Sequence, residues 1–108
     1  MRIAVLSDIH GNLPALQAVL SDMARRGVDR VINCGDILSG PLWPRETGDE
    51  LMALAWPTIA GNHERQLLAC ARRPGGASDQ YAFDHTTLAQ RDWLAALPAT
   101  LEPTPGVF

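Results

Sequence analysis

Short apolar runs and amphipathic stretches alternate along the first part of the chain. Residues 2–7 and 30–34 are apolar runs without polar alternation, which is typical of strands buried in a parallel sheet. Between them, leucines and a methionine recur at helical spacing over residues 13–23, and Asn12 and Gly27 stand where a cap and a stop signal belong. The order strand, helix, strand predicts a βαβ unit, in which the two strands run parallel.

The pattern continues with more helices and a third strand. Helices are predicted at residues 45–55, 64–72 and 86–97, and a strand at residues 56–60. The stretch RPGGASD, residues 73–79, is interpreted as a breaker between the last two helices, and residues 98–108 as a linker or the approach to another strand. We therefore predict the α/β class, with mostly parallel strands connected by crossover helices.

Each of the three predicted strands leads into side chains that can bind a metal. Asp8 and His10 follow the first strand, Asp36 follows the second, and Asn62 and His63 follow the third. Because ligands bind outside the carboxyl ends of parallel strands, neighbouring strands should bring these residues together. Carboxylates, imidazole and an amide oxygen suit Mn²⁺, Fe, Zn²⁺ or Mg²⁺ better than a metal that prefers thiolates. Asp36, at the middle tip, could bridge two ions that lie ~3.5–4 Å apart.

Each candidate also has an ordinary structural explanation. Asp8 could be an acid at a helix start, Asp36 a turn residue, and Asn62 the N-cap of the following helix. Taken together, the motifs favour metal binding for Asp8 and Asp36, whereas Asn62 could serve both roles. His63 is expected to be a catalytic group rather than a histidine of the core.

Three further residues are left outside the predicted site. Glu64 is expected to support the helix dipole or to hold a metal ligand in place. His85 is interpreted as a solvated residue near a helix start. Trp43 could stack on a substrate base, but we expect it to cover the core.

The blocks SDIHGN, NCGDIL and AGNHE occur in this order along the chain. They resemble the Asp-x-His, Gly-Asp and Gly-Asn-His-Glu/Asp motifs of the calcineurin-like metallophosphoesterase superfamily, nearest its small single-domain prokaryotic members. The resemblance extends from Met1 to about Leu68. It implies a four-layer αββα sandwich, of which residues 1–108 would be the N-terminal portion of the metallophosphoesterase domain.

The resemblance also implies a reaction and a role for each candidate residue. Asp8 and His10 would hold a first metal, Asp36 would bridge, and Asn62 would hold a second metal, whereas His63 would face the leaving group. The two divalent ions would be Mn, Fe, Zn, Ni or Mg, with Mn favoured. The implied activity is hydrolysis of a phosphoric ester by a hydroxide that bridges the metals.

The chain departs from the family pattern in its later ligands. The family completes its site with further histidines, including a Gly-His-x-His block, but after His63 this sequence contains only His85. The second metal would keep only Asp36 and Asn62, so we expect it to bind weakly. An alternative hypothesis is therefore a truncated or degenerate, non-catalytic metal-binding module that needs a second segment or chain to complete its site.

A second departure concerns the histidine expected to act on the leaving group. Eukaryotic protein-phosphatase relatives place a carboxylate three residues after the Gly-Asp acid to orient this histidine, but Ser39 occupies that position here. This argues against a protein serine/threonine phosphatase. Small phosphodiesters or dinucleoside polyphosphates are therefore the favoured substrates.

Composition narrows the other classes of function. Nine arginines and no lysine stand against twelve acids, a net charge of −3, so no footprint for nucleic acid or an anionic membrane is expected. No stretch approaches the ~20 apolar residues of a membrane span. Cys34 and Cys70 form no disulfide framework, which fits a cytoplasmic protein.

Half of a sandwich would expose an apolar sheet face, so self-association into a homo-oligomer is expected.

Overall fold

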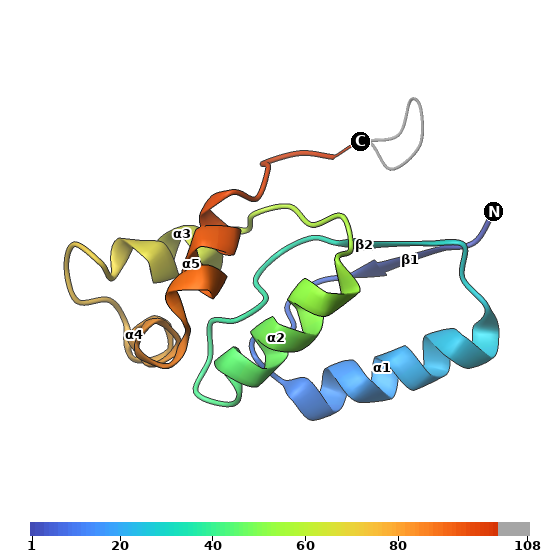
Figure 1. Ribbon diagram of the computed structural model, residues 1–108, viewed down its shortest axis with the longest axis horizontal. Helices are drawn as coiled ribbons and strands as arrows, with labels where there is room; N and C mark the ends of the chain where they lie inside the picture. The colour runs from blue at the N-terminus through green and yellow to red at the C-terminus, as the bar shows by residue number, and fades with distance from the viewer. Residues whose placement is uncertain (102–108) are drawn as a thin grey trace.

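The computed structural model describes residues 1–101 and contains the predicted strand–helix–strand unit (Figure 1). Strand β1 (Ile3–Leu6) and strand β2 (Arg30–Asn33) pair in parallel, and helix α1 (Leu13–Arg26) connects them. The side chain of Asn12 accepts a hydrogen bond from the backbone N–H of Ala15 and so caps the helix, as predicted. This unit carries the loops that follow β1 and β2 to the same edge of the sheet.

The third predicted strand is reduced to a single parallel bridge between Asn33 and Thr58. The backbone N–H of Asn33 donates to the carbonyl of Pro57, and the N–H of Ile59 donates to the carbonyl of Asn33, both over 2.9 Å. Pro57 itself has no N–H to continue a ladder, which limits the pairing. The bridge nevertheless places β2 between β1 and this segment, so the loop after β2 is the middle one.

Four more helices follow β2 within the part of the chain that the structure describes. They are α2 (Pro44–Leu54), α3 (Asn62–Ala69), α4 (Ala77–His85) and α5 (Leu88–Ala95). The prediction missed α4. The breaker was expected over residues 73–79, but α4 already begins after Gly76, and its apolar residues form no stripe at helical spacing. His85 ends α4 and also lies just before α5, near a helix start as expected, and it is exposed.

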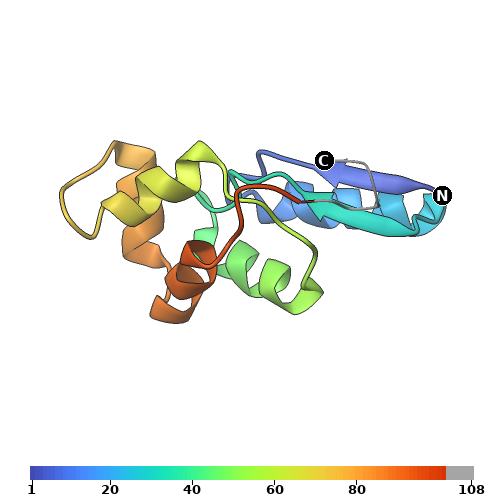
Figure 2. The same ribbon diagram turned by 90° about the horizontal axis from the view of Figure 1, so that it is seen from above.

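Helices α1 and α2 lie on one side of the two strands, and α3, α4 and α5 lie beyond the carboxyl ends of the strands (Figures 1 and 2). A single buried cluster joins them. Its fully or almost fully buried members are Leu16, Ile37, Leu38, Leu51, Leu67, Ala82 and Leu94. Ile37 and Leu38 are completely buried directly after Asp36, so the core fixes the loop that carries this acid.

The other side of the sheet carries no helix within residues 1–101, as both views show. The described residues thus form one sheet with helices on one face, which is part of the sandwich that the resemblance implies. Trp43 is 44% exposed, so the expectation that it covers the core was wrong. The buried residue at this point is its neighbour Pro44, the first residue of α2. None of the helices in residues 1–101 has the length and apolar composition that crossing a membrane would require.

Candidate metal centre

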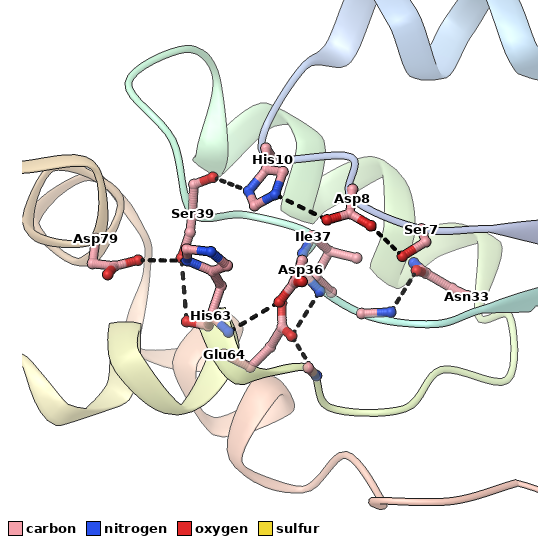
Figure 3. A network of polar contacts seen from close by, with 12 residues as sticks. Ser7, Asp8, His10, Asn33, Asp36, Ile37, Ser39, His63, Glu64 and Asp79 are labelled. Atoms are coloured by element: carbon pink, nitrogen blue, oxygen red, sulfur yellow. Dashed lines mark hydrogen bonds and ion pairs between the residues drawn. The ribbon is translucent and has the colours of Figure 1, made fainter.

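Asp8, His10 and Asp36 come together at the carboxyl ends of β1 and β2. Each offers one ligand atom, and these atoms all lie within 4.8 Å of one another (Figure 3). Backbone hydrogen bonds hold the two loops side by side, since the N–H of Asp8 donates to the carbonyl of Gly35 and the N–H of His10 to the carbonyl of Asp36, both over 3.0 Å. The strand order thus produces the cluster expected from the sequence.

All three residues have left-handed backbone conformations. The φ angles of Asp8, His10 and Asp36 are 58°, 49° and 57°. Such a conformation costs a non-glycine residue ~1–2 kcal/mol. Within residues 1–101, Ala55 at the end of α2 is the other non-glycine residue with positive φ. The strain is therefore concentrated at the cluster, which is a feature of functional sites.

His10 is held in one tautomer. Its Nδ1 atom lies 2.7 Å from the carbonyl oxygen of Ser39, and because a carbonyl can only accept, Nδ1 carries a proton and donates. In the neutral ring, Nε2 then presents a lone pair, 3.4 Å from Oδ1 of Asp8. Two electron-rich atoms this close need a proton or a cation between them. This arrangement is the usual one for a metal-binding histidine.

Asp8 is prepared to act as a carboxylate. The Ser7 hydroxyl donates a hydrogen bond of 2.6 Å to its Oδ2. This bond lowers the pKa of Asp8, desolvation opposes it, and His10 and His63 lower it further when their rings are protonated. The side chain is 63% exposed, so an ion can reach it from solvent.

Glu64 anchors the loop that contains Asp36. Its side chain is buried, with 2% of the residue exposed. It accepts hydrogen bonds from the backbone N–H groups of Asp36, Ile37 and Gly61 over 2.8, 2.7 and 2.7 Å. Both roles expected for Glu64 are visible in the structure, since it holds the loop of Asp36 in place and, as the acid in the first turn of α3, also accepts the N–H of the N-cap residue (Figure 3).

The glycine before Asn62 is required by the close approach of Asp36. A Cβ atom on Gly61 would lie 2.5 Å from Oδ1 of Asp36, a distance that real Cβ atoms do not tolerate. The same oxygen accepts the backbone N–H of His63 over 2.9 Å. The carboxylate of Asp36 is therefore packed directly against the first turn of α3.

His63 lies beside the cluster, and Asn62 precedes it on α3. The rings of His63 and His10 meet edge to face, with centroids 5.0 Å apart and an angle of 86° between their planes. Asn62 is exposed and is the first residue of α3, whereas Gly61 is the N-cap, so the capping role considered for Asn62 was wrong. The backbone places both residues next to Asp36.

The side chain of Asp79 was missed by the sequence analysis. Its Oδ1 atom lies 3.3 Å from Nδ1 of His63. Ser39, which stands where some relatives have the orienting acid, donates its hydroxyl to the backbone carbonyl of His63 over 3.2 Å instead. The signal that could have revealed Asp79 is an acid in the first turn of a helix, but α4 itself was not predicted.

Fold and cluster together define an α/β protein whose candidate metal centre lies at the ends of parallel strands. Residues 1–103 match the calcineurin-like phosphoesterase family, and the chain belongs to that family. The resemblance noted in the sequence motifs is thereby confirmed.

Individual relatives support the same assignment. The chain is 41% identical over 66 residues to the uncharacterized protein MJ0912 of Methanocaldococcus jannaschii. The aligned segment covers 61% of this chain and 27% of that protein. It superposes on a metallophosphoesterase from Sphaerobacter thermophilus with a TM-score of 0.72 and 32% identity, over 91% of this chain and 41% of the other. A protein described as a putative diadenosine tetraphosphatase shares the fold, with a TM-score of 0.71 and 24% identity over 90% and 43% of the two chains. The chain thus spans less than half the length of each of these proteins.

Proposed function

We propose that the protein is a metal-dependent hydrolase of phosphoric esters. The observation that carries this proposal is the cluster of Asp8, His10 and Asp36 at the strand ends, with the His63 ring against it. Family membership supports the reaction class. The metal ligands and the catalytic role of His63 are part of the proposal.

The residues present fit a divalent ion. Asp8 and Asp36 supply carboxylate oxygens, and His10 directs a bare Nε2 towards Asp8, a donor set suited to Mn²⁺ and similar ions. These three residues would hold the first ion, and Asp36 with Asn62 would hold the second. When bound, the ions would acidify the attacking water and neutralise charge on the phosphoryl oxygens.

The protein's own side chains would then manage the leaving group. As the water oxygen forms its bond to phosphorus and releases a proton to solvent, the old P–O bond breaks and its electron pair stays on the leaving oxygen. His63, protonated on both ring nitrogens, would donate the proton on Nε2 to that oxygen and be left neutral. Asp36 and Glu64 hold the backbone at the start of α3, so His63 stays in place throughout.

We further propose a substrate that carries a nucleobase, such as a dinucleoside polyphosphate. A cavity of about 450 Å³ lies between the start of α2 and the end of α4, and Trp43, Tyr81 and His85 are among the residues that line it. The backbone N–H of Trp43 donates to the carbonyl of Gly11, which follows His10, so one wall of the cavity is tied to the loop that carries His10. Aromatic side chains at its wall can stack on a base.

We propose a cytoplasmic location and self-association as well. Cys34 and Cys70 are free cysteines, which is the state expected in a reducing compartment. Val5 on β1 is 62% exposed, and the neighbouring face of the sheet carries no helix within the described residues. An exposed apolar strand of this kind favours pairing with another copy.

The function is tested by assaying the chain for hydrolysis of bis-(p-nitrophenyl) phosphate and diadenosine tetraphosphate. We expect activity that requires Mn²⁺ and disappears with EDTA. Trp43→Ala should raise KM for diadenosine tetraphosphate about 10-fold, because stacking on a base is worth ~1–3 kcal/mol. Inorganic tetrapolyphosphate has the same phosphate chain without bases, so its KM should not change.

Met52→Ala is the matched control, because Met52 is also exposed on α2 but does not line the cavity. Equal changes in KM for both polyphosphates in Trp43→Ala would contradict the proposed base site. A chain that binds Mn²⁺ but hydrolyses none of these substrates would favour the non-catalytic metal-binding module. One observation favours that alternative. Residues 1–101 contain one group of three acidic or histidine ligands, whereas a centre with two metal ions would need a second such group.

A further inference from the structure

We propose that Asp79 of α4 is the positioning residue that orients His63, replacing the carboxylate that some relatives carry where this chain has Ser39. The inference rests on the proposed function, in which His63 serves the leaving group. Its basis is the contact of 3.3 Å between Oδ1 of Asp79 and Nδ1 of His63 (Figure 3). This contact joins residues 16 positions apart, on two different helices.

The burial of Asp79 is not explained by its place in the helix alone. An acid in the first turn of a helix is favourable at the surface too, because the dipole acts there. Asp79 is only 9% exposed, and burial of a carboxylate is costly unless a partner compensates for it. His63 is the partner that the structure provides, and its own side chain is 36% exposed.

Helix packing fixes Asp79 in this position. Ala82 lies one turn after Asp79 on the same face of α4 and is completely buried in the core. Leu67 of α3 belongs to the same buried cluster and lies one turn after His63. The apolar contacts between α3 and α4 therefore hold the carboxylate against the imidazole.

Ser39 cannot take over this role. Its hydroxyl donates to the backbone carbonyl of His63, and its own carbonyl accepts the Nδ1 proton of His10. The hydroxyl and the carbonyl of Ser39 therefore both form hydrogen bonds to groups other than the His63 ring. Asp79 is the acid that contacts this ring within the described residues.

The contact determines which nitrogen of His63 is free for chemistry. A carboxylate accepts hydrogen bonds, so Nδ1 of His63 carries the proton and donates to Asp79. Nε2, on the other side of the ring, is then the nitrogen that takes up a second proton and, in the imidazolium form, delivers it to the leaving oxygen. Figure 3 shows the His63 ring between Asp79 and His10, as this arrangement requires. Asp79 thus acts on the reaction only through His63.

NMR of the 108-residue chain tests the inference without any metal or substrate. Long-range ¹H–¹⁵N spectra, recorded about two units above the usual histidine pKa of ~6.5, report which nitrogen is protonated. We expect the Nδ1–H tautomer for His63, assigned by the loss of its signals in His63→Gln. Asp79→Ala should shift His63 to the Nε2–H tautomer that free imidazole favours, whereas Asp92→Ala, an exposed acid of α5, should not. An Nε2–H tautomer in the unmodified chain would overturn the inference, whether or not Asp79→Ala folds.

Turnover with Mn²⁺ gives the second readout. Asp79→Ala should lower kcat by about 10- to 100-fold for esters with poor leaving groups, with little change for good ones and none in KM. An equal loss for both kinds of ester would also overturn the inference. If the wild-type chain shows the Nδ1–H tautomer but no hydrolysis, the proposed function fails and the placement of Asp79 stands. If it hydrolyses esters with His63 in the other tautomer, the function stands and the role of Asp79 fails.

Discussion

Replacing His63 by alanine should reduce turnover of bis-(p-nitrophenyl) phosphate by about 10²- to 10⁴-fold, the loss expected for a positioned general acid. The ring lies against His10 and is held by Asp79, but it belongs to no group of ligand atoms in residues 1–101. Metal binding should therefore persist in His63→Ala. The loss should shrink for substrates with good leaving groups, because such groups need no proton.

Asn62→Ala is the matched variant, since Asn62 precedes His63 on the same turn of α3. It should lower metal occupancy, and excess Mn²⁺ should restore part of the activity. The two variants can be separated by measuring bound manganese and initial rates in the same samples. If His63→Ala loses metal and excess Mn²⁺ rescues it, then His63 is a ligand and the proposed roles within AGNHE are wrong.

Replacing Glu64 by alanine should destabilise the protein by about 3–5 kcal/mol, the range for breaking a buried charged contact. The carboxylate accepts three backbone N–H groups, from Asp36, Ile37 and Gly61, and alanine would leave all three without this partner. A loss of this size approaches the ~5–15 kcal/mol that stabilises a typical domain. Urea unfolding followed by circular dichroism measures it.

Glu64→Gln keeps the shape and one acceptor oxygen, so its loss should be smaller. Glu46→Ala makes the same chemical change at an exposed position of α2 and should cost no more than about 1 kcal/mol. A Glu64→Ala protein as stable as Glu46→Ala would show that the three hydrogen bonds do not hold the loop.

The first half of the fold could be predicted because its signals are local. Short apolar runs mark β1 and β2, and helical spacing of apolar residues marks α1. Asn12 and Gly27 mark the two ends of that helix. Parallel pairing then places the ends of both strands at one edge, which is why Asp8, His10 and Asp36 could be expected together. The left-handed backbone of these three residues could not be predicted, because aspartate and histidine adopt it only occasionally and none of the three is glycine.

Helix α4 could not be predicted, because tertiary packing decides it. Tyr81, Ala82 and Phe83 are consecutive, so they form no apolar stripe, and Gly75 and Gly76 suggest a loop. Burial of Ala82 against the core stabilises the helix nevertheless. Asp79 was missed with it, because its contact with His63 joins two helices and the 16-residue separation belongs to no known motif.

The central claim is that Asp8, His10 and Asp36 form one metal site, and titration of the metal-free chain with Mn²⁺ tests it most directly. Calorimetry should give about one tight ion per chain. Within the described residues, these three form the group of acidic and histidine side chains whose ligand atoms lie close enough to share one ion. Asp8→Ala should weaken binding by more than the ~10- to 100-fold that loss of a supporting residue costs, whereas Asp92→Ala should leave it unchanged. Unchanged affinity in Asp8→Ala, or no binding to the unmodified chain, would contradict the account.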